Sequence, residues 1–361
     1  MILIVGAGPA GSLAALLLGK ENEVILAEEH QALGYPVQCA GLISDRCYES
    51  YRKYCRIHRA LENKIEGAVF FSPSGDYFTA FGDAYVVERK VLDEMLLERA
   101  SEFAEVSVKT KVKFEGGNPV VADRKIFPDF LIGADGVNSE VARAFGFERP
   151  EIMTALQIEA KFEPFDENFV EIYLGRAYSD FFAYAIPLGD TARIGVIAKG
   201  NALGYLQNLI KRHPSVSRRF RGSILELNSG TIPSELVRFV KQKVALIGDA
   251  AGMVKPHTGG GLYYLLFAAE KLAENFPNLK AYERDFMKGL GKEIKLGKRI
   301  RKVYDLTDSE LNSIVKAMKG FDFSGVHMDR PSTLFSPAVL FRAIKTILRE
   351  PSLLRIASKL L

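Results

Sequence analysis

The chain opens on a short apolar run that leads directly into a glycine-rich turn. Residues 2–5 (ILIV) are all large and apolar, which is typical of a strand buried on both faces. The turn GAGPAG follows at residues 6–11, and residues 9–20 predict a helix. A second apolar run at residues 23–27 completes a series of strand, turn, helix and strand, which predicts a parallel α/β unit.

Further along, hydrophobic and polar positions predict first a hairpin and then a helix. Sheet-like runs at residues 67–71 and 77–81 surround the polar turn SPSGD. Residues 89–103 place apolar side chains on one face of a helical repeat. These segments continue the alternation of strands and helices that begins at the N-terminus.

After Pro150 the pattern changes to longer strand-rich segments, which predict a separate antiparallel sheet. A buried-type strand at residues 243–247 then returns the chain to the first unit, and the residues after Gly261 are mainly helical. The first unit is therefore discontinuous in sequence. The strand-rich segments lie at residues 154–162, 169–174, 181–187 and 192–198.

Composition and charge describe an ordinary globular protein. The 361 residues are 48% hydrophobic, and the net charge of +4 is too small to indicate a nucleic-acid partner. No apolar run reaches the roughly 18 residues that cross a bilayer. A strand that begins at Ile2 leaves no room for a signal peptide, so we expect a cytoplasmic protein. Cys39, Cys47 and Cys55 form no CxxC pair, which predicts free thiols and no metal site.

The first turn has the spacing of a dinucleotide-binding motif. Gly6 permits a tight turn, Gly8 lets the backbone approach phosphates, and Gly11 allows the helix to pack on the strand. Ala10 lies in the same turn, at the positive end of the helix. Glu28 follows Gly6 by 22 positions, close to the spacing of an acid that binds a ribose hydroxyl. An ordinary glycine-rich turn is the alternative.

Two later motifs point from a dinucleotide in general to a flavin. ADG brings Asp135 and Gly136 to the end of a buried strand, and GDAAG brings Asp249 to the end of another. Gly260 and Gly261 then open a long apolar helix. An acid at a strand end can accept hydrogen bonds from ribityl hydroxyls, and helix N-terminal amides can face the pyrimidine edge of the flavin ring. A helix cap at Asp249 and a simple glycine turn are the alternative.

The motifs GxGxxG, ADG and GDAAG, in this order, resemble the FAD-dependent hydroxylase and reductase superfamily typified by p-hydroxybenzoate hydroxylase. The resemblance implies FAD and an α/β fold with a Rossmann-type FAD-binding domain, an antiparallel-sheet substrate domain and a helical C-terminal region. It also implies that Arg89 lies near the FAD phosphates, with an exposed cation at a helix start as the alternative. The expected FAD-binding domain comprises residues 1–65, 82–150 and 238–290, the substrate domain residues 66–81 and 151–237, and the helical region residues 291–361.

Within that superfamily two segments are similar to the geranylgeranyl reductases, which saturate isoprenoid double bonds. PVQCAGLIS resembles their Pro-x-x-Cys segment, which implies that Cys39 and Ala40 lie at the flavin and that Cys39 is catalytic. A small buried hydrophobe is the alternative for Cys39. FAYAIP stands where the family has a Tyr-x-Trp-x-Phe-Pro strand, which implies that Phe182, Tyr184 and Ile186 line a prenyl channel. Here Tyr, Trp and Phe are replaced by Phe, Tyr and Ile, and the chain has no Trp.

The resemblance implies an FAD-dependent reductase that hydrogenates isolated C=C bonds of geranylgeranyl chains in archaeal membrane lipid synthesis. The substrate is then a prenyl lipid, the electron donor is NAD(P)H or a ferredoxin, and Cys39 or a water supplies the proton. His257 is assigned to the substrate site, with a structural neighbour of the helix start as the alternative. An aromatic monooxygenase of the same fold and a non-catalytic prenyl-binding chaperone are the rival functions.

Two basic stretches bear on membrane contact. Residues 336–350 set apolar side chains against Arg342, Lys345 and Arg349, so this segment is a candidate for resting on an anionic membrane. A solvated face over a packed helix is the alternative for both stretches. The other stretch is a cationic stripe with helical spacing, formed by Lys288, Lys292, Lys295, Arg299 and Lys302.

Overall fold

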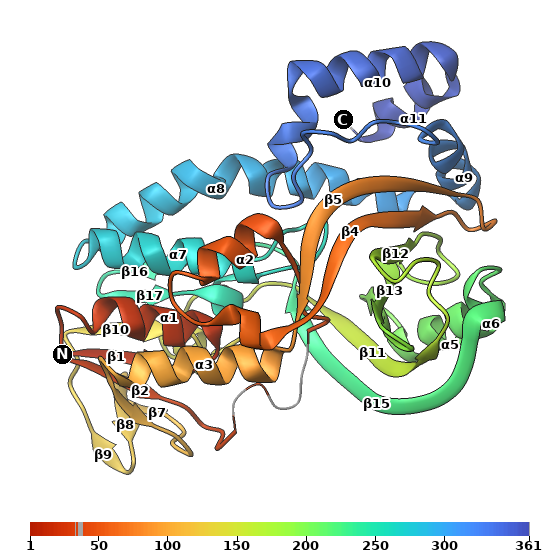
Figure 1. Ribbon diagram of the computed structural model, residues 1–361. Helices are drawn as coiled ribbons and strands as arrows, with labels where there is room; N and C mark the ends of the chain where they lie inside the picture. Colours follow the sequence, from red (N-terminus) through yellow and green to blue (C-terminus); the bar gives the residue numbers. More distant parts are fainter. Residues whose placement is uncertain (33, 35–38, 361) are drawn as a thin grey trace.

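The computed structural model describes residues 1–32, 34 and 39–360, and it has two large sheets side by side with a group of helices at one end (Figure 1). Pro36, the first residue of the Pro-x-x-Cys segment, lies outside the described residues. In the described part, Cys39, Cys47 and Cys55 are free thiols, as expected.

The first sheet is the expected α/β unit. Its six strands are parallel except for the short β16, which pairs antiparallel with β17. β1 stands near the centre because all four of its residues are apolar and buried, so it can have a neighbour on each side. In sheet order the strands are β16 (Val240–Lys241), β17 (Val244–Leu246), β10 (Phe130–Gly133), β1 (Ile2–Val5), β2 (Val24–Ala27) and β6 (Glu105–Ser107).

Helices pack against this sheet around α1, which contacts both α3 and α7 (Figure 1). All but one of the α1 residues after Pro9 are buried, so this helix forms part of the core rather than a surface stripe. A small sheet of three strands lies beside the unit. The remaining elements here are α1 (Pro9–Leu18), α2 (Asp45–Tyr51), η1 (Ile57–Ala60), α3 (Arg89–Ser101), β7 (Lys113–Glu115), β8 (Asn118–Val121), β9 (Arg124–Lys125), α4 (Glu140–Ala144), η2 (Gly248–Ala251) and α7 (Leu262–Asn275).

The second sheet has eight strands and is antiparallel except where β12 runs parallel to β4. β4 and β5 form the expected hairpin, but both are longer than predicted and cross the expected domain boundaries near residues 65 and 82. In sheet order the strands are β15 (Phe220–Pro233), β11 (Ile152–Phe162), β14 (Thr191–Ala198), β13 (Phe182–Leu188), β12 (Phe169–Tyr173), β4 (Leu61–Phe71), β5 (Tyr77–Val87) and β3 (Leu42–Ser44).

The two faces of the second sheet have different environments. Ala183 and Ala185 of β13 face a core that includes α5 (Ala202–Arg212) and α6 (Val216–Arg219). The alternate residues Phe182, Tyr184 and Ile186 belong to a different cluster on the opposite face. That opposite face is the wall of the cavity described below.

The C-terminal region is helical, as expected, and covers the ends of β4 and β5 (Figure 1). Leu311 and Val315 of α9 belong to one hydrophobic cluster with Phe78 of β5 and with Leu174, which directly follows β12. No helix in the described ranges is long and apolar enough to cross a membrane. The elements are α8 (Leu279–Arg301), η3 (Lys302–Asp305), α9 (Asp308–Ala317), η4 (Pro331–Phe335), α10 (Pro337–Arg349) and α11 (Ser352–Leu360).

Candidate active site

The glycine turn between β1 and α1 is shaped to receive phosphates. Gly6 has φ +94°, and a Cβ on Gly11 would lie 1.8 Å from the carbonyl oxygen of Gly6, so both positions require glycine. A Cβ on Gly8 would meet nothing within 4 Å, because Gly8 borders a cavity. α1 begins at Pro9 with no acidic residue in its first turn, so its positive end faces that cavity.

Glu28 stands at the end of β2, as the motif predicts. Its buried carboxylate accepts hydrogen bonds from the backbone N–H of Ala7 and of His30, each at 2.8 Å. The first bond ties the end of β2 to the glycine turn. Binding of a ribose hydroxyl by Glu28 stays a prediction.

The two later acids have different surroundings. Asp135 accepts hydrogen bonds from Ser139 Oγ at 2.6 Å and from the Val141 N–H at 3.1 Å, so its carboxylate stabilises the start of α4. The neighbouring Gly136 borders the cavity at φ +71°. Asp249 lines the cavity directly, and burial raises its pKa to about 6 even though Arg89 opposes the shift. Contact of Asp135 with the flavin stays a prediction, and Asp249 is better placed to meet a cofactor.

Arg89 is held at the cavity wall by an acid one helical turn away. Its Nε and Nη2 atoms each donate to Asp93 at 3.0 Å. Its side chain is only 17% exposed, so the alternative of an exposed cation at the helix start is wrong. Although burial lowers it, the pKa of Arg89 is raised by Asp93 and then by Cys39, and the guanidinium stays charged.

The start of α7 offers backbone donors to the same cavity. Gly259 has φ +74°, and Gly259, Gly260 and Gly261 all line the cavity. In the described structure no side chain caps Gly261, and the first turn of α7 holds no acid. The Gly259 N–H donates to the Lys255 carbonyl at 2.8 Å and the Gly260 N–H to Thr258 Oγ1 at 3.4 Å. The amides from Gly261 onward suit an electron-rich edge of a ring, which fits the pyrimidine edge of a flavin.

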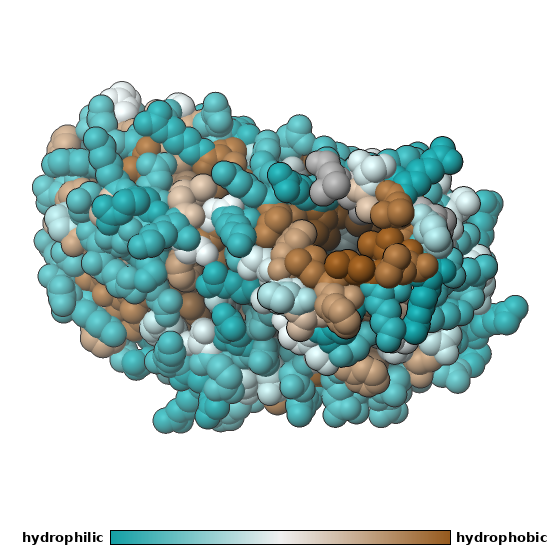
Figure 2. All heavy atoms as spheres, turned by 90° about the horizontal axis from the view of Figure 1, so that it is seen from above, coloured by the Kyte–Doolittle hydropathy of each residue, from teal (hydrophilic) through white to brown (hydrophobic). Residues whose placement is uncertain are grey.

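A single cavity of about 980 Å³ joins these features to the second sheet. It extends from Gly8 past Arg89 and Asp249 to β13, and then to Met318 and Leu334 in the C-terminal region. Figure 2 shows a hollow bordered by hydrophobic side chains on the face that carries the C-terminal helices. The glycine cradle, the facing amides and this volume fit an FAD together with an apolar ligand.

The apolar wall of the cavity comes from alternate residues of β13. Phe182, Tyr184 and Ile186 are all buried and line the cavity, as their spacing on one strand predicts. The Tyr184 hydroxyl donates a hydrogen bond to Gln157 Oε1 at 2.9 Å, so this buried polar group has a partner although it is shielded from water. A Cβ on Gly195 would lie 2.5 Å from Tyr184 Oη, so Gly195 makes room for this ring.

Cys39 lies between the FAD cradle and the apolar wall. Its Sγ accepts a hydrogen bond from the Gly41 N–H at 3.4 Å, and the residue lines the cavity half-buried. Its thiol is near enough to Arg89 and Tyr184 to affect the pKa of each. A catalytic role for Cys39 stays a prediction.

His257 also lines the cavity, next to α7. Burial, and then the neighbouring Lys255, lower its pKa to about 4, so the imidazole is neutral at neutral pH. A Cβ on Gly297 of α8 would lie 2.9 Å from His257 Nδ1, so this ring packs closely against that helix. These contacts favour the structural alternative for His257, and its substrate contact stays a prediction.

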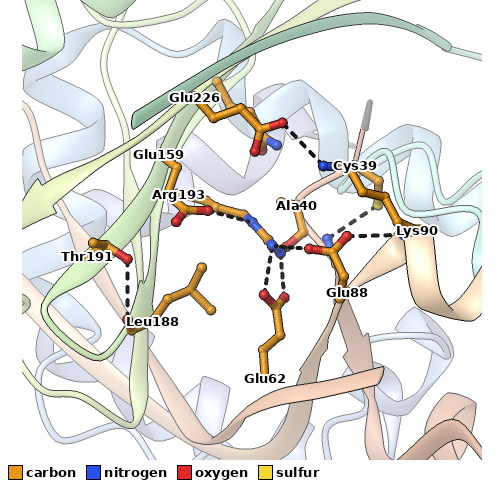
Figure 3. Close-up of polar contacts among 12 residues, drawn as sticks. Cys39, Ala40, Glu62, Glu88, Lys90, Glu159, Leu188, Thr191, Arg193 and Glu226 are labelled. Carbon is orange, nitrogen blue, oxygen red and sulfur yellow. Dashed lines mark hydrogen bonds and ion pairs between the residues drawn. The ribbon is translucent and has the colours of Figure 1, made fainter. Parts of the chain in front are cut away.

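The sequence motifs missed Arg193, which organises the loop that carries Cys39 (Figure 3). Arg193 is 5% exposed and donates to the Ala40 carbonyl at 3.2 Å, to Glu62 at 3.0 Å and to Glu88 at 3.2 Å. It thereby ties β14 to the loop, to β4 and to the residue that precedes α3. A lone arginine in the apolar strand TARIGVIA is the signal that could have revealed it, because a buried charge needs partners.

The Asp249 carboxyl predicts a pH dependence of FAD binding. Because its pKa is about 6, the group holds a proton below that pH and is a carboxylate above it. If the carboxylate accepts a ribityl hydroxyl, the Kd for FAD should rise by up to about tenfold per pH unit below pH 6. Fluorescence titration of the apoprotein between pH 5 and 8 measures this. Asp249→Asn should bind more weakly at pH 8 with a flat profile, and an unchanged slope in that variant would exclude Asp249 as the source.

Fold and site together define a flavoprotein with a Rossmann-type domain. A family model described as "FAD binding domain" matches residues 1–202. An uncharacterised protein of Methanocaldococcus jannaschii is 31% identical, over 92% of this chain and 93% of that protein. The chain therefore belongs to the FAD binding domain family, and it is an FAD-dependent oxidoreductase.

Further relatives confirm the resemblance to geranylgeranyl reductases. A digeranylgeranylglycerophospholipid reductase of the same organism is 29% identical, over 91% of this chain and 93% of that enzyme. A solved structure from Thermoplasma acidophilum, described as geranylgeranyl bacteriochlorophyll reductase-like, has a TM-score of 0.83 at 22% identity and covers 100% of this chain and 98% of that one. The structural likeness confirms the fold.

Proposed function

We propose that the protein is a reductase of isolated C=C bonds in the isoprenoid chains of membrane lipids. The observation that carries this proposal is the continuous cavity, in which the FAD cradle passes directly into the apolar wall formed by Phe182, Tyr184 and Ile186. A long apolar chain with methyl branches, such as an isoprenoid, suits such a wall, because burial of each CH₂ group contributes about 0.8 kcal/mol. The names of the curated relatives support the same substrate class.

In this reaction the residues of the chain hold the substrate, exclude water and supply a proton. Once reduced by the electron donor, a bound FAD would supply a hydride to one carbon of the double bond. The β13 wall holds the chain in place and excludes water, and the polar tip of Tyr184 stays bound to Gln157. The second carbon needs a proton, and Cys39 carries one at the junction of the cradle and the wall.

The proposal is tested with protein reduced by dithionite without oxygen. After incubation with an unsaturated geranylgeranyl lipid, mass spectrometry should find one added pair of hydrogens for each reduced bond. No gain of hydrogen pairs would overturn the proposal. Parallel incubations with NADPH or with reduced ferredoxin identify the electron donor, since each is a candidate. Oxygen uptake stimulated by a phenol would instead support an aromatic monooxygenase.

We also propose that α10 rests on the membrane that holds this lipid. One apolar face of this helix is exposed, with Phe341 72% and Leu348 77% exposed, and Lys345 and Arg349 alternate with these residues. Val339 and Ile347 pack inward instead. The cationic stripe of α8 differs, because the helix also buries an apolar face and the stripe is solvated. The hollow of Figure 2 opens on the same side, which gives a lipid chain a path to the cavity.

This proposal predicts a loss of vesicle binding. Phe341→Asp combined with Leu348→Asp should reduce sedimentation with vesicles of anionic phospholipid at least tenfold. The reason is that burial of each apolar side chain in the membrane contributes up to about 1.5–3 kcal/mol of binding free energy. Lys292→Ser on α8 is the matched control and should bind as the native chain does. Equal sedimentation of the α10 variant and the control would contradict the proposal.

A further inference from the structure

Lys255 is a buried cation beside the start of α7 that no sequence motif assigned. It lies on the loop between η2 and α7, and only 4% of the residue is exposed. A Cβ on Gly260 would lie 2.9 Å from its Cε and 3.3 Å from its Nζ. The ammonium group therefore lies beside Gly260, just before α7 begins, at the wall of the cavity.

A fully buried acid holds this lysine in place. Lys255 Nζ donates to Asp329 Oδ1 at 2.7 Å, and Ser44 Oγ donates to the other oxygen of Asp329. Although burial opposes the shift, Lys255 and Ser44 hold the pKa of Asp329 below its usual value, so Asp329 is a carboxylate. The backbone N–H of Asp329 also donates to His327 Nδ1 at 3.2 Å, which fixes the acid further.

Lys255 is the cation that lies beside the start of α7 at this end of the cavity. Among the described lining residues, the lysine and arginine side chains are Lys255 and Arg89. Arg89 directs its Nε and Nη2 atoms at Asp93, one turn into α3, and its side chain also hydrogen-bonds with Cys39. His257 is neutral at neutral pH, because its pKa is lowered to about 4 by burial and then by Lys255.

We propose that Lys255 sets the reduction potential of the bound FAD. Reduction adds negative charge to the pyrimidine part of the flavin ring, which we assign to the start of α7. A buried positive charge at that end stabilises the reduced cofactor more than the oxidised one, and the effect is strong because little water screens it. Asp329 has the opposite sign and limits the effect. The proposal rests on FAD alone and does not depend on the prenyl substrate.

The test is a spectroelectrochemical titration of the FAD-loaded protein. Lys255→Met should lower the midpoint potential by about 30 mV or more, which is a tenfold change in the two-electron equilibrium. Asp329→Asn should raise it, and Lys255→Arg should preserve it. The double variant Lys255→Met/Asp329→Asn should lie between the two single variants. The exposed Lys292→Met on α8 is the control and should titrate like the native protein.

Opposite shifts distinguish an electrostatic role from a structural one. If Lys255 only supports the loop, both single variants should hold FAD less tightly and shift the potential in the same direction or not at all, which would overturn the proposal. If Lys255→Met does not fold, Asp329→Asn decides alone, because the proposal requires its potential to rise. Each outcome is independent of whether a prenyl lipid is reduced.

Discussion

Replacing Arg193 by methionine is expected to lower the free energy of unfolding by about 1–3 kcal/mol, because it leaves two partly buried carboxylates and a carbonyl without their donor. Glu62 and Glu88 each lose a charged donor, and the Ala40 carbonyl loses its partner at 3.2 Å. Burial already raises the pKa of Glu62, and Arg193 opposes that shift. Denaturant unfolding of the apoproteins measures the change without a contribution from FAD.

The control for this variant is an exposed cation in the same sheet. Lys161→Met on β11 should change the free energy of unfolding by no more than about 0.5 kcal/mol. Arg193→Lys keeps the charge but cannot span several acceptors, so an intermediate loss is expected. A loss below about 1 kcal/mol for Arg193→Met would show that this cluster does not hold the Cys39 loop.

Replacing Cys39 by alanine is expected to lower the rate of prenyl reduction by about 10²–10⁴-fold, which is the usual contribution of a positioned acid. FAD affinity and the free energy of unfolding should change little, because the thiol is half-buried, its hydrogen bond from the Gly41 N–H is long, at 3.4 Å, and Arg89 keeps its two bonds to Asp93. Single-turnover oxidation of the reduced protein by an unsaturated lipid measures the rate.

Cys55→Ala is the matched control, because Cys55 is a buried free thiol whose Sγ donates to the Tyr51 carbonyl at 3.8 Å and does not line the described cavity. It should react at the native rate. A native rate in Cys39→Ala would exclude this thiol as the proton source and leave a water in that role.

The motifs on the FAD side were predictable because their chemistry is local. A tight turn, a close backbone approach and a helix start each need a particular residue within a few positions of the others, as at Gly6 and Gly11. The β13 wall was also predictable, because alternate side chains of a strand share a face. The surroundings of Asp135 were not predictable from its motif, which does not reveal that Ser139 and Val141 donate hydrogen bonds to its two carboxylate oxygens.

Long-range contacts account for what the sequence did not reveal. Lys255 finds its acid 74 residues away and Arg193 contacts Glu62 131 residues away, so no local spacing marks either pair. β15 was missed because FRGSILELNSGTIP is largely polar and exposed, with Gly222 and Ser223 at positive φ. It forms a strand because β11 supplies a continuous pairing edge. Which apolar residues of α10 are exposed, among them Phe341 and Leu348, likewise became visible only in the structure.

The most direct test of the proposed reaction is the anaerobic return of the oxidised FAD spectrum when an unsaturated geranylgeranyl lipid is mixed with the reduced protein. We predict that the absorbance of oxidised FAD returns with one hydrogen pair gained by the lipid per FAD. The saturated lipid should cause no change. A spectrum that stays reduced with the unsaturated lipid, in protein that is reoxidised normally by oxygen, would contradict the proposed function.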